Sequence, residues 1–293
     1  MVQRSFSWLA LLLVAPFAVI YGLIFVYPTI SMFVLSFTDA PLIGSGEYVG
    51  FDNYNRLLFH DRRMATALWN TAYFVILSVI PGTAIALLIA LGIQRLKGRL
   101  QAFVLTLFFL PFILPVSVVY WLWDWLLNFQ FGIVMHLLDT LGIARVPVFK
   151  TITWFMPAVA VVTIWWTAGF SLLLFLAGLR AIPPEIYEAA ALDNASRWRV
   201  FSRITWPLLW PITALVLTIQ LILQLKIFDQ VYLFSRGGRP NDTIVMVQHI
   251  FNTAFVDDHG GRAAAIAVTL FLIVIAITVG QFQVLRWVGG ERK

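Results

Sequence analysis

The chain has 293 residues, of which 61% are hydrophobic and only 12% are charged, and its mean hydropathy is +0.88. Roughly a quarter of the residues of a soluble domain are charged, so this composition excludes an ordinary soluble protein and indicates a polytopic membrane protein. The net charge of +6 fits basic loops at a cytoplasmic membrane face better than nucleic-acid binding, and the lack of cysteine excludes disulfides and thiolate chemistry.

The first apolar stretch, residues 5–38, contains no Asp, Glu, Lys or Arg. It is much longer than the apolar region of roughly 7–15 residues in a secretory signal peptide. We therefore expect a retained first membrane span. Because it is too long for a straight crossing, we expect kinks at Pro16 and Pro28 and ends that protrude from the bilayer.

Five further uncharged stretches are long enough to cross the ~30 Å hydrocarbon core, which takes about 20 helical residues. The sequence therefore predicts an all-α membrane protein with six transmembrane helices. The six stretches are residues 5–38, 64–94, 100–123, 151–179, 204–225 and 263–285. The uncharged segment 125–138 is shorter and contains Asn128 and His136, which favours an interfacial or partly re-entrant segment over a seventh span.

Basic residues set the expected orientation. If the N-terminus is inside, the inner segments carry slightly more Arg and Lys than the outer loops, and the short inner loop R-L-K-G-R at 95–99 carries three of them. Positive charge in short loops marks the cytoplasmic side. We therefore expect both termini, and the charged segment after the fourth span, to be cytoplasmic.

The sequence contains no local signature of an enzyme. None of the four lysines follows a glycine, which excludes a Walker A nucleotide site, and no two of the four histidines are four residues apart. We therefore expect no catalytic residue, no metal site and no cofactor in this chain.

Ionisable residues near the spans are candidates for a solute path. Asp124 lies in the aromatic stretch Y-W-L-W-D-W, and Lys226 and Asp229 are three residues apart at the outer end of the fifth span, where they could pair on one helix face. The alternatives are interfacial anchoring for Asp124 and mutual neutralisation for the other two. A chain of buried carboxylates is absent, which disfavours a proton-coupled carrier.

Uncharged polar and aromatic side chains offer a second set of path candidates. Gln220 and Gln224 are one helical turn apart and share a face, and their amides supply the donors and acceptors that sugar hydroxyls need. Trp165 and Trp166 in the fourth span could stack on a sugar ring. Helix–helix hydrogen bonds and lipid or helix packing are the competing interpretations for these four residues.

The stretch 181–207 is charged and helix-favouring between two apolar spans. Pro183 and Pro184 predict a helix that starts near residue 184, with Glu185 and Glu188 in its first turns. The dipeptide D-N at 193–194 predicts a turn, because Asn tolerates the left-handed conformation that ends a helix. A second helix follows with Arg197, Arg199 and Arg203. The exposed alanines 189–191 predict a docking surface for a cytoplasmic partner.

This stretch resembles the EAA loop of ABC-importer permeases. Glu188, Ala189 and Ala190 match its first part, and Ile204 and Pro207 match its later part. Two positions depart from the pattern, since Asn194 stands where Gly is usual and Trp206 where Leu is usual. The segments starting at Asn70, Leu107 and Leu233 are similar to the first permease subunit of the carbohydrate-uptake group, of the maltose and glycerol-phosphate type.

The resemblance implies a type I ABC importer permease fold with a cytoplasmic coupling-helix hairpin, in which Glu188, Ala189, Ala190, Asn194 and Arg197 contact an ATPase. The implied organisation is an N-terminal helix and outer loop (1–63), a core (64–285) that contains the EAA loop, and a cytoplasmic tail (286–293).

It also implies partners in a bacterial inner membrane: a second permease, two ATPase subunits that bind ATP and Mg, and an extracytoplasmic solute-binding protein. The implied solute is a sugar or sugar derivative. A permease for another polar solute, such as a polyol or a glycerol-phosphate-like compound, and an ion-coupled carrier working alone remain the alternatives.

Overall fold

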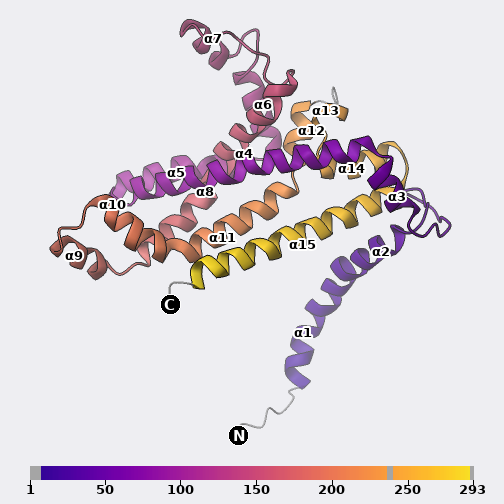
Figure 1. Ribbon diagram of the computed structural model, residues 1–293, viewed down its shortest axis with the longest axis horizontal. Helices are drawn as coiled ribbons and strands as arrows, with labels where there is room; N and C mark the ends of the chain where they lie inside the picture. The colour runs from indigo at the N-terminus through magenta and orange to yellow at the C-terminus, as the bar shows by residue number, and fades with distance from the viewer. Residues whose placement is uncertain (1–7, 236–239, 291–293) are drawn as a thin grey trace. The chain divides into compact units, whose positions relative to one another are not determined.

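The computed structural model describes residues 8–235 and 240–290 (Figure 1). Every longer regular element within these residues is helical, and a single isolated bridge pairs Thr38 with Tyr48. The all-α prediction is therefore confirmed. The backbone groups into two units, Met1–Arg62 with His249–Leu272 and Arg63–Gln248 with Ile273–Lys293, and each is described by itself.

The first unit begins with a continuous apolar helix. It consists of α1 (Trp8–Tyr21), a π-helical turn (Gly22–Val26) and α2 (Tyr27–Leu35). Pro28 has no N–H and crowds the carbonyl four residues before it, so the ladder shifts by one residue and the Tyr27 N–H donates to the Gly22 carbonyl. The irregularity predicted near Pro28 is thus a π-turn. The segment Leu12–Leu35 can span a membrane, and its most apolar window is not buried within the protein.

Buried polar side chains hold the loops of this unit. On α3 (Asp52–Phe59), the Asn53 amide donates to the carbonyls of Ser36 (2.9 Å) and Thr38 (2.7 Å), which follow the end of α2. His249, on α14 (Met246–Phe251), places Nε2 2.8 Å from Asp61 Oδ2. These contacts satisfy backbone and ring groups that burial would otherwise leave without water.

Four other predicted spans coincide with long helices. Residues 64–94 lie within α4 (Arg62–Ile93) and the adjoining turn, and residues 151–179 correspond to α8 (Ile152–Arg180). Residues 204–225 lie on the helix that ends with α11 (Trp206–Leu225), and 263–285 lie within α15 (Gly260–Gly290). Together with the first helix, five helices among the described residues are long and apolar enough to cross a membrane.

The third predicted span, residues 100–123, is not one straight helix. It consists of α5 (Gly98–Ile113) and α6 (Val116–Leu126), which meet at an angle of 103°. Pro115 causes the break because a residue before proline avoids the α conformation, and Leu114 is extended with ψ 137°. The Trp166 indole donates to the carbonyl of Leu114 at 3.1 Å. Six spans result only if this bent pair counts as one, so the number six stays a prediction.

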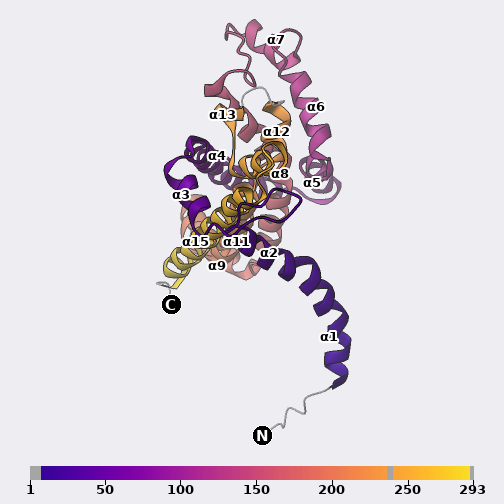
Figure 2. The ribbon, with the colours of Figure 1, turned by 90° about the vertical axis from the view of Figure 1, so that its right-hand side faces the viewer.

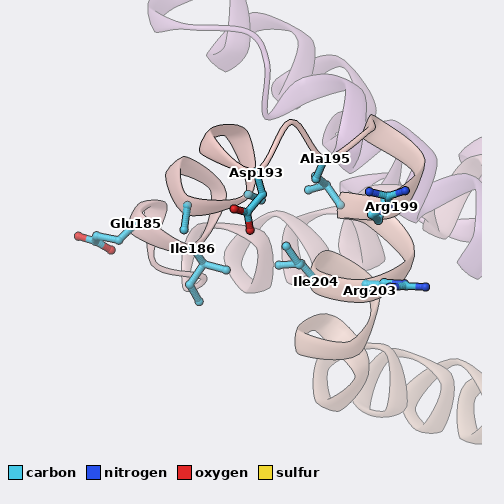
Figure 3. A pocket seen from close by; sticks show the side chains of 10 residues that line it. Glu185, Ile186, Asp193, Ala195, Arg199, Arg203 and Ile204 are labelled. Carbon is cyan, nitrogen blue, oxygen red and sulfur yellow. The ribbon is translucent and has the colours of Figure 1, made fainter.

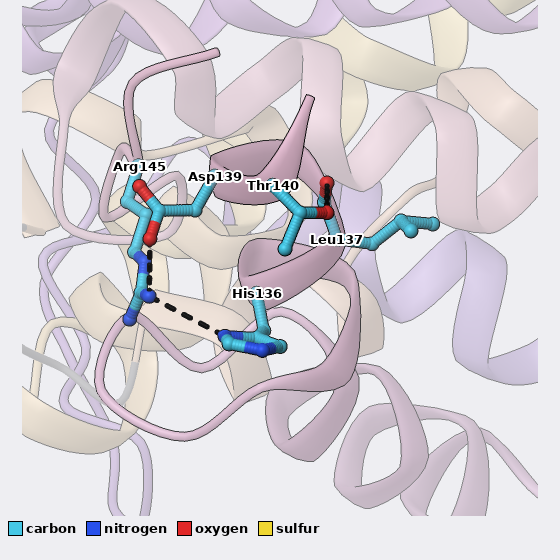
Figure 4. A network of polar contacts seen from close by, with 5 residues as sticks. All are labelled: His136, Leu137, Asp139, Thr140 and Arg145. Atoms are coloured by element: carbon cyan, nitrogen blue, oxygen red, sulfur yellow. Dashed lines mark hydrogen bonds and ion pairs between the residues drawn. The ribbon is translucent and has the colours of Figure 1, made fainter. Parts of the chain in front are cut away.

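Beyond α6 the chain forms a short excursion rather than a seventh span, and Figure 2 shows α6 leading away from α5 towards it. Its helix α7 (Ile133–Thr140) has only eight residues, too few to cross a bilayer. Arg145 bonds to Asp139 at 2.5 Å and approaches His136 Nδ1 at 3.5 Å, as Figure 4 shows. This network closes the loop that returns from α7 to α8.

The second unit is packed tightly around α8. Helices α5 and α8 are in extensive contact, and Gly169 permits it: a Cβ at this position would lie 2.3 Å from the carbonyl oxygen of Phe108. Asn70 of α4 donates to the carbonyls of Asp242 (3.0 Å) and Ile244 (2.9 Å) and so anchors the end of α13 (Pro240–Thr243).

The predicted pairing of Lys226 with Asp229 on one helix face is wrong. Helix α11 ends at Leu225 and α12 (Asp229–Ser235) begins four residues later, so Lys226 lies between the helices and Asp229 starts the second one. Among the described residues no ion pair joins them.

Candidate functional site

The charged segment forms a helical hairpin whose first helix is α9 (Pro184–Leu192). Proline occupies the first helical position and Glu185 the first turn, as predicted. Asn194 ends the helix with φ 49°, its N–H bonds to the carbonyl of Ala191 (3.1 Å), and the N–H of Ala195 bonds to that of Ala190 (3.0 Å). These bonds are those of a Schellman motif, so the predicted left-handed role of Asn194 is confirmed.

The second helix of the hairpin continues into the membrane span. Helix α10 (Arg197–Val200) is capped by Ser196, whose hydroxyl accepts from the Arg199 N–H, and a π-turn (Phe201–Thr205) joins it to α11. The Trp206 N–H donates to the Phe201 carbonyl, one residue before Pro207. Residues Arg197–Leu225 therefore form one helix of 29 residues, and Pro207 does not interrupt it.

A groove of about 630 Å³ lies between the two arms of the hairpin (Figure 3). Its apolar lining includes Ile186 and Ile204 together with Ala189 and Ala190. Its charged lining is divided by sign, because Glu185 and Asp193 come from the α9 arm whereas Arg199 and Arg203 come from the α10 arm. Arg199 and Arg203 are four residues apart, and Figure 3 shows both side chains on the side away from Glu185. The groove can thus receive an apolar ridge flanked by charges of both signs.

The five predicted coupling residues occupy three different positions on the hairpin. Ala189 and Ala190 line the groove, whereas Glu188 and Arg197 are exposed outside its lining and Asn194 forms the turn. The prediction that Ala190 is exposed is wrong, since only 6% of it is accessible. It occupies the face of α9 that turns towards the returning chain.

Tyr187 and Thr205 connect the two arms of the hairpin, and neither was a candidate from the sequence. The Tyr187 hydroxyl lies 3.3 Å from Thr205 Oγ1, at the end of the π-turn. A polar residue at the start of the following span is the one signal that points to Thr205. The contact makes the groove part of the folded hairpin rather than of either helix alone.

A second contact ties the predicted inner loops to one end of the helices. Arg180, the last residue of α8, donates from Nη2 to Gln101 Oε1 at 2.8 Å, and Gln101 donates from Nε2 to the carbonyl of Ile93 at 3.0 Å. The loop that contains R-L-K-G-R and the base of the hairpin therefore lie at the same end of the second unit (Figure 1).

The two glutamines of the predicted solute path are buried within the chain. Gln220 is 5% exposed and donates to Ser171 Oγ on α8 at 2.7 Å, and Gln224 is 4% exposed and donates to Gln220 Oε1 at 3.1 Å. This relay fits helix–helix hydrogen bonding. Ser171 was missed because its partner depends on how α8 and α11 are aligned.

The aromatic path candidates occupy different surroundings. Trp166 donates its only side-chain N–H, that of the indole, to the carbonyl of Leu114, so this donor is already bonded. Trp165 meets Trp123 edge to face at 5.4 Å between centroids, and Trp123 Nε1 is buried with no partner among the described residues. Asp124 lines cavities at the end of α6, whose linings include neither tryptophan nor either glutamine.

Comparisons with known proteins show which family and which relatives the chain resembles. Residues 82–286 match the family described as "Binding-protein-dependent transport system inner membrane component". The sulfoquinovosyl glycerol transport system permease SmoG of Agrobacterium fabrum is 31% identical, with 95% of this chain and 90% of the relative aligned. The trehalose/maltose transport system permease MalF of Thermococcus litoralis is also 31% identical, over 95% of this chain and 94% of the relative.

A solved structure agrees with these sequence relatives. A chain of a bacterial alginate ABC transporter, in complex with a periplasmic protein that carries an alginate pentasaccharide, has a TM-score of 0.85 and 27% identity, with 96% of this chain and 95% of that chain aligned. The match covers well over half of the chain, and the helical hairpin falls inside it. The chain therefore belongs to the family of binding-protein-dependent transport system inner membrane components.

Proposed function

We propose that the chain is the permease subunit of an ATP-driven importer that carries a saccharide across the cytoplasmic membrane. Family membership supports transport that depends on a solute-binding protein. The relatives support a saccharide over a polyol or a glycerol-phosphate-like solute, because their names specify sulfoquinovosyl glycerol, trehalose, maltose and alginate.

The hairpin is the observation that carries the ATP-driven part of the proposal. The part of the chain that the structure describes has five long apolar helices, yet the hairpin groove is lined by two acids, two arginines and several apolar side chains. Desolvating such charges is favourable only against a partner of complementary charge and shape. The partner is an ATPase subunit that binds ATP and Mg at its own site. When the ATPase subunits close on ATP, rigid-body motion at this interface transmits the movement to the membrane spans.

The remaining organisation follows from the same proposal. Both termini and the hairpin lie in the cytoplasm, and a second, similar permease completes the translocation path with two ATPase subunits below. The first helix offers an apolar surface to lipid or to a partner, because no residue in the most apolar window of Leu12–Leu35 is buried within the chain. Hydrolysis belongs to the partner, and this chain holds no catalytic residue.

The test is ATP-driven uptake into proteoliposomes that contain the chain together with a second permease, an ATPase and a solute-binding protein from the same organism. Glu188→Lys reverses a charge outside the groove and Glu185→Lys reverses one in its lining. We expect each to lower uptake at least about tenfold while ATP hydrolysis continues, since a misplaced interfacial charge costs 2 kcal/mol or more.

Glu47→Lys is the matched control, because it makes the same charge change at an exposed residue before α3. Normal uptake by the Glu188 and Glu185 variants at normal expression would contradict the docking role. Uptake in vesicles that lack the ATPase would contradict the whole proposal and would favour an ion-coupled carrier.

A further inference from the structure

A second hollow is lined by residues from the end of α6, the start of α8 and the end of α12. Figure 1 shows α6 and α12 away from the hairpin helices α9 and α10. It encloses about 390 Å³, and its lining includes Asp124, Asn128, Phe149 and Lys150. A neighbouring cavity of about 340 Å³ is lined by the same four residues. The two cavities therefore adjoin across a shared wall, and each is in the size range of small-molecule sites.

An aromatic wall forms one side of the first cavity. The rings of Phe149 and Phe234 stack with centroids 4.2 Å apart and an interplanar angle of 21°, and Phe155 is buried beside them with 1% exposure. Phe149 itself stays half-buried and lines both cavities. A ring held by stacking on a second ring offers an apolar surface to a ligand at a low cost in side-chain entropy.

The polar side chains around this wall offer donors and acceptors. Asn128 Oδ1 already accepts from two backbone N–H groups (3.0 and 3.4 Å), so its Nδ2 group is the donor left over among the described residues. Thr151 Oγ1 donates to a backbone carbonyl at 3.1 Å, which leaves its oxygen as an acceptor. Lys150 is exposed and contributes an ammonium with three donors.

The aromatic wall and the polar groups beside it together favour a saccharide as the ligand. A saccharide has a flat C–H face that packs on an aromatic ring and hydroxyls that donate and accept along its edge, which matches Phe149, Asn128 and Thr151. Both charge signs border the cavity, Asp124 and Lys150, so no strong preference for an anion or a cation follows. The shared wall between two cavities fits a ligand with more than one ring.

We infer that these cavities form a receiving site for an oligosaccharide of at least two rings, at the end of the permease away from the hairpin. The inference rests on the proposed saccharide transport and adds a binding site in this chain. The return loop from α7 supports the site, because the Arg145–Asp139 bond, which Figure 4 shows, closes that loop. Phe149 and Lys150 follow Arg145 within five residues along the chain.

The experiment is binding of the full chain in lipid nanodiscs to a glycan array that carries monosaccharides, disaccharides and longer chains. We expect retention on disaccharides or longer chains but not on monosaccharides. Phe149→Ala and Lys150→Gln should each weaken the apparent affinity about tenfold, a change equal to 1.4 kcal/mol. Phe103→Ala is the matched control, since Phe103 is 67% exposed on α5, outside both linings, and its loss should change nothing.

Several outcomes would overturn the inference: an empty array, equal binding of monosaccharides, or unchanged affinity of both site variants. Lys150 is exposed, so Lys150→Gln tests the site without disturbing the core. If ATP-driven uptake works while the array stays empty, the receiving site is wrong and the proposed function stands. If the array binds but uptake needs no ATPase, the proposed function fails instead.

Discussion

Gly169→Ala tests the tight contact between α5 and α8. The new Cβ would lie 2.3 Å from the carbonyl oxygen of Phe108 and 2.7 Å from the Cα of Phe109. Real Cβ atoms essentially never approach closer than 3.0 Å, so the α5 backbone must retreat by at least 3.0 − 2.3 = 0.7 Å. Backbone cannot give way as a flexible side chain does, so the helices themselves must separate.

The expected cost follows from this displacement. Overpacking a close contact costs about 1–3 kcal/mol, and a backbone clash along the extensive contact between α5 and α8 belongs at the upper end. Alanine recovers up to about 1 kcal/mol of helix propensity relative to glycine, which leaves a net loss of about 2 kcal/mol. At roughly 2 °C per kcal/mol for a chain of this size, the unfolding midpoint should fall by about 4 °C.

The assay is thermal unfolding of the purified chain in detergent, followed by intrinsic tryptophan fluorescence. Gly92→Ala is the matched control in α4, because a Cβ there meets nothing within 4 Å and alanine should leave the midpoint unchanged or raise it. An unchanged or higher midpoint for Gly169→Ala would refute the argument that this glycine is required for the contact between α5 and α8.

Three further predictions concern single polar residues. Asn194→Gly should leave thermal stability within about 0.5 kcal/mol, whereas Asn194→Val should lose about 2 kcal/mol by the same fluorescence assay, because a β-branched residue is strained at φ 49°. Asn70→Leu should cost about 2–3 kcal/mol in that assay, since it leaves the carbonyls of Asp242 and Ile244 without their donor. Gln224→Leu should impair ATP-driven uptake while co-purification with the ATPase stays intact, and unchanged uptake would leave Gln224 with a packing role alone.

The elements that follow from local rules were predictable. Two prolines, first-turn acids and an Asn at the turn define α9 because helix starts and ends depend on nearby residues. Five long apolar stretches likewise became five long helices. The family resemblance was visible in the same hairpin, and the match over residues 82–286 confirms it.

What the sequence could not specify depends on contacts between distant segments. The buried state of Ala190 and the closing contact of Tyr187 with Thr205 require the two arms to fold together. Ser171 becomes the partner of Gln220 only through the alignment of α8 with α11. The break at Pro115 was readable in principle, but apolar character on both sides of it made residues 100–123 look like one span.

The π-turn at Phe201–Thr205 changes the orientation of the α10 side chains about the helix axis, relative to α11. A π-turn adds one residue to an α-helix, and one residue corresponds to about 100° of rotation. Arg199, which precedes the turn, is therefore rotated by about this angle relative to α11 from where an uninterrupted α-helix would place it, whereas Arg203 lies within the turn itself. Deleting one residue from this turn would rotate the charged lining without altering a single charge. The rotation of the backbone between α10 and α11, as well as the identity of the side chains, thus determines which partner surface the hairpin can contact.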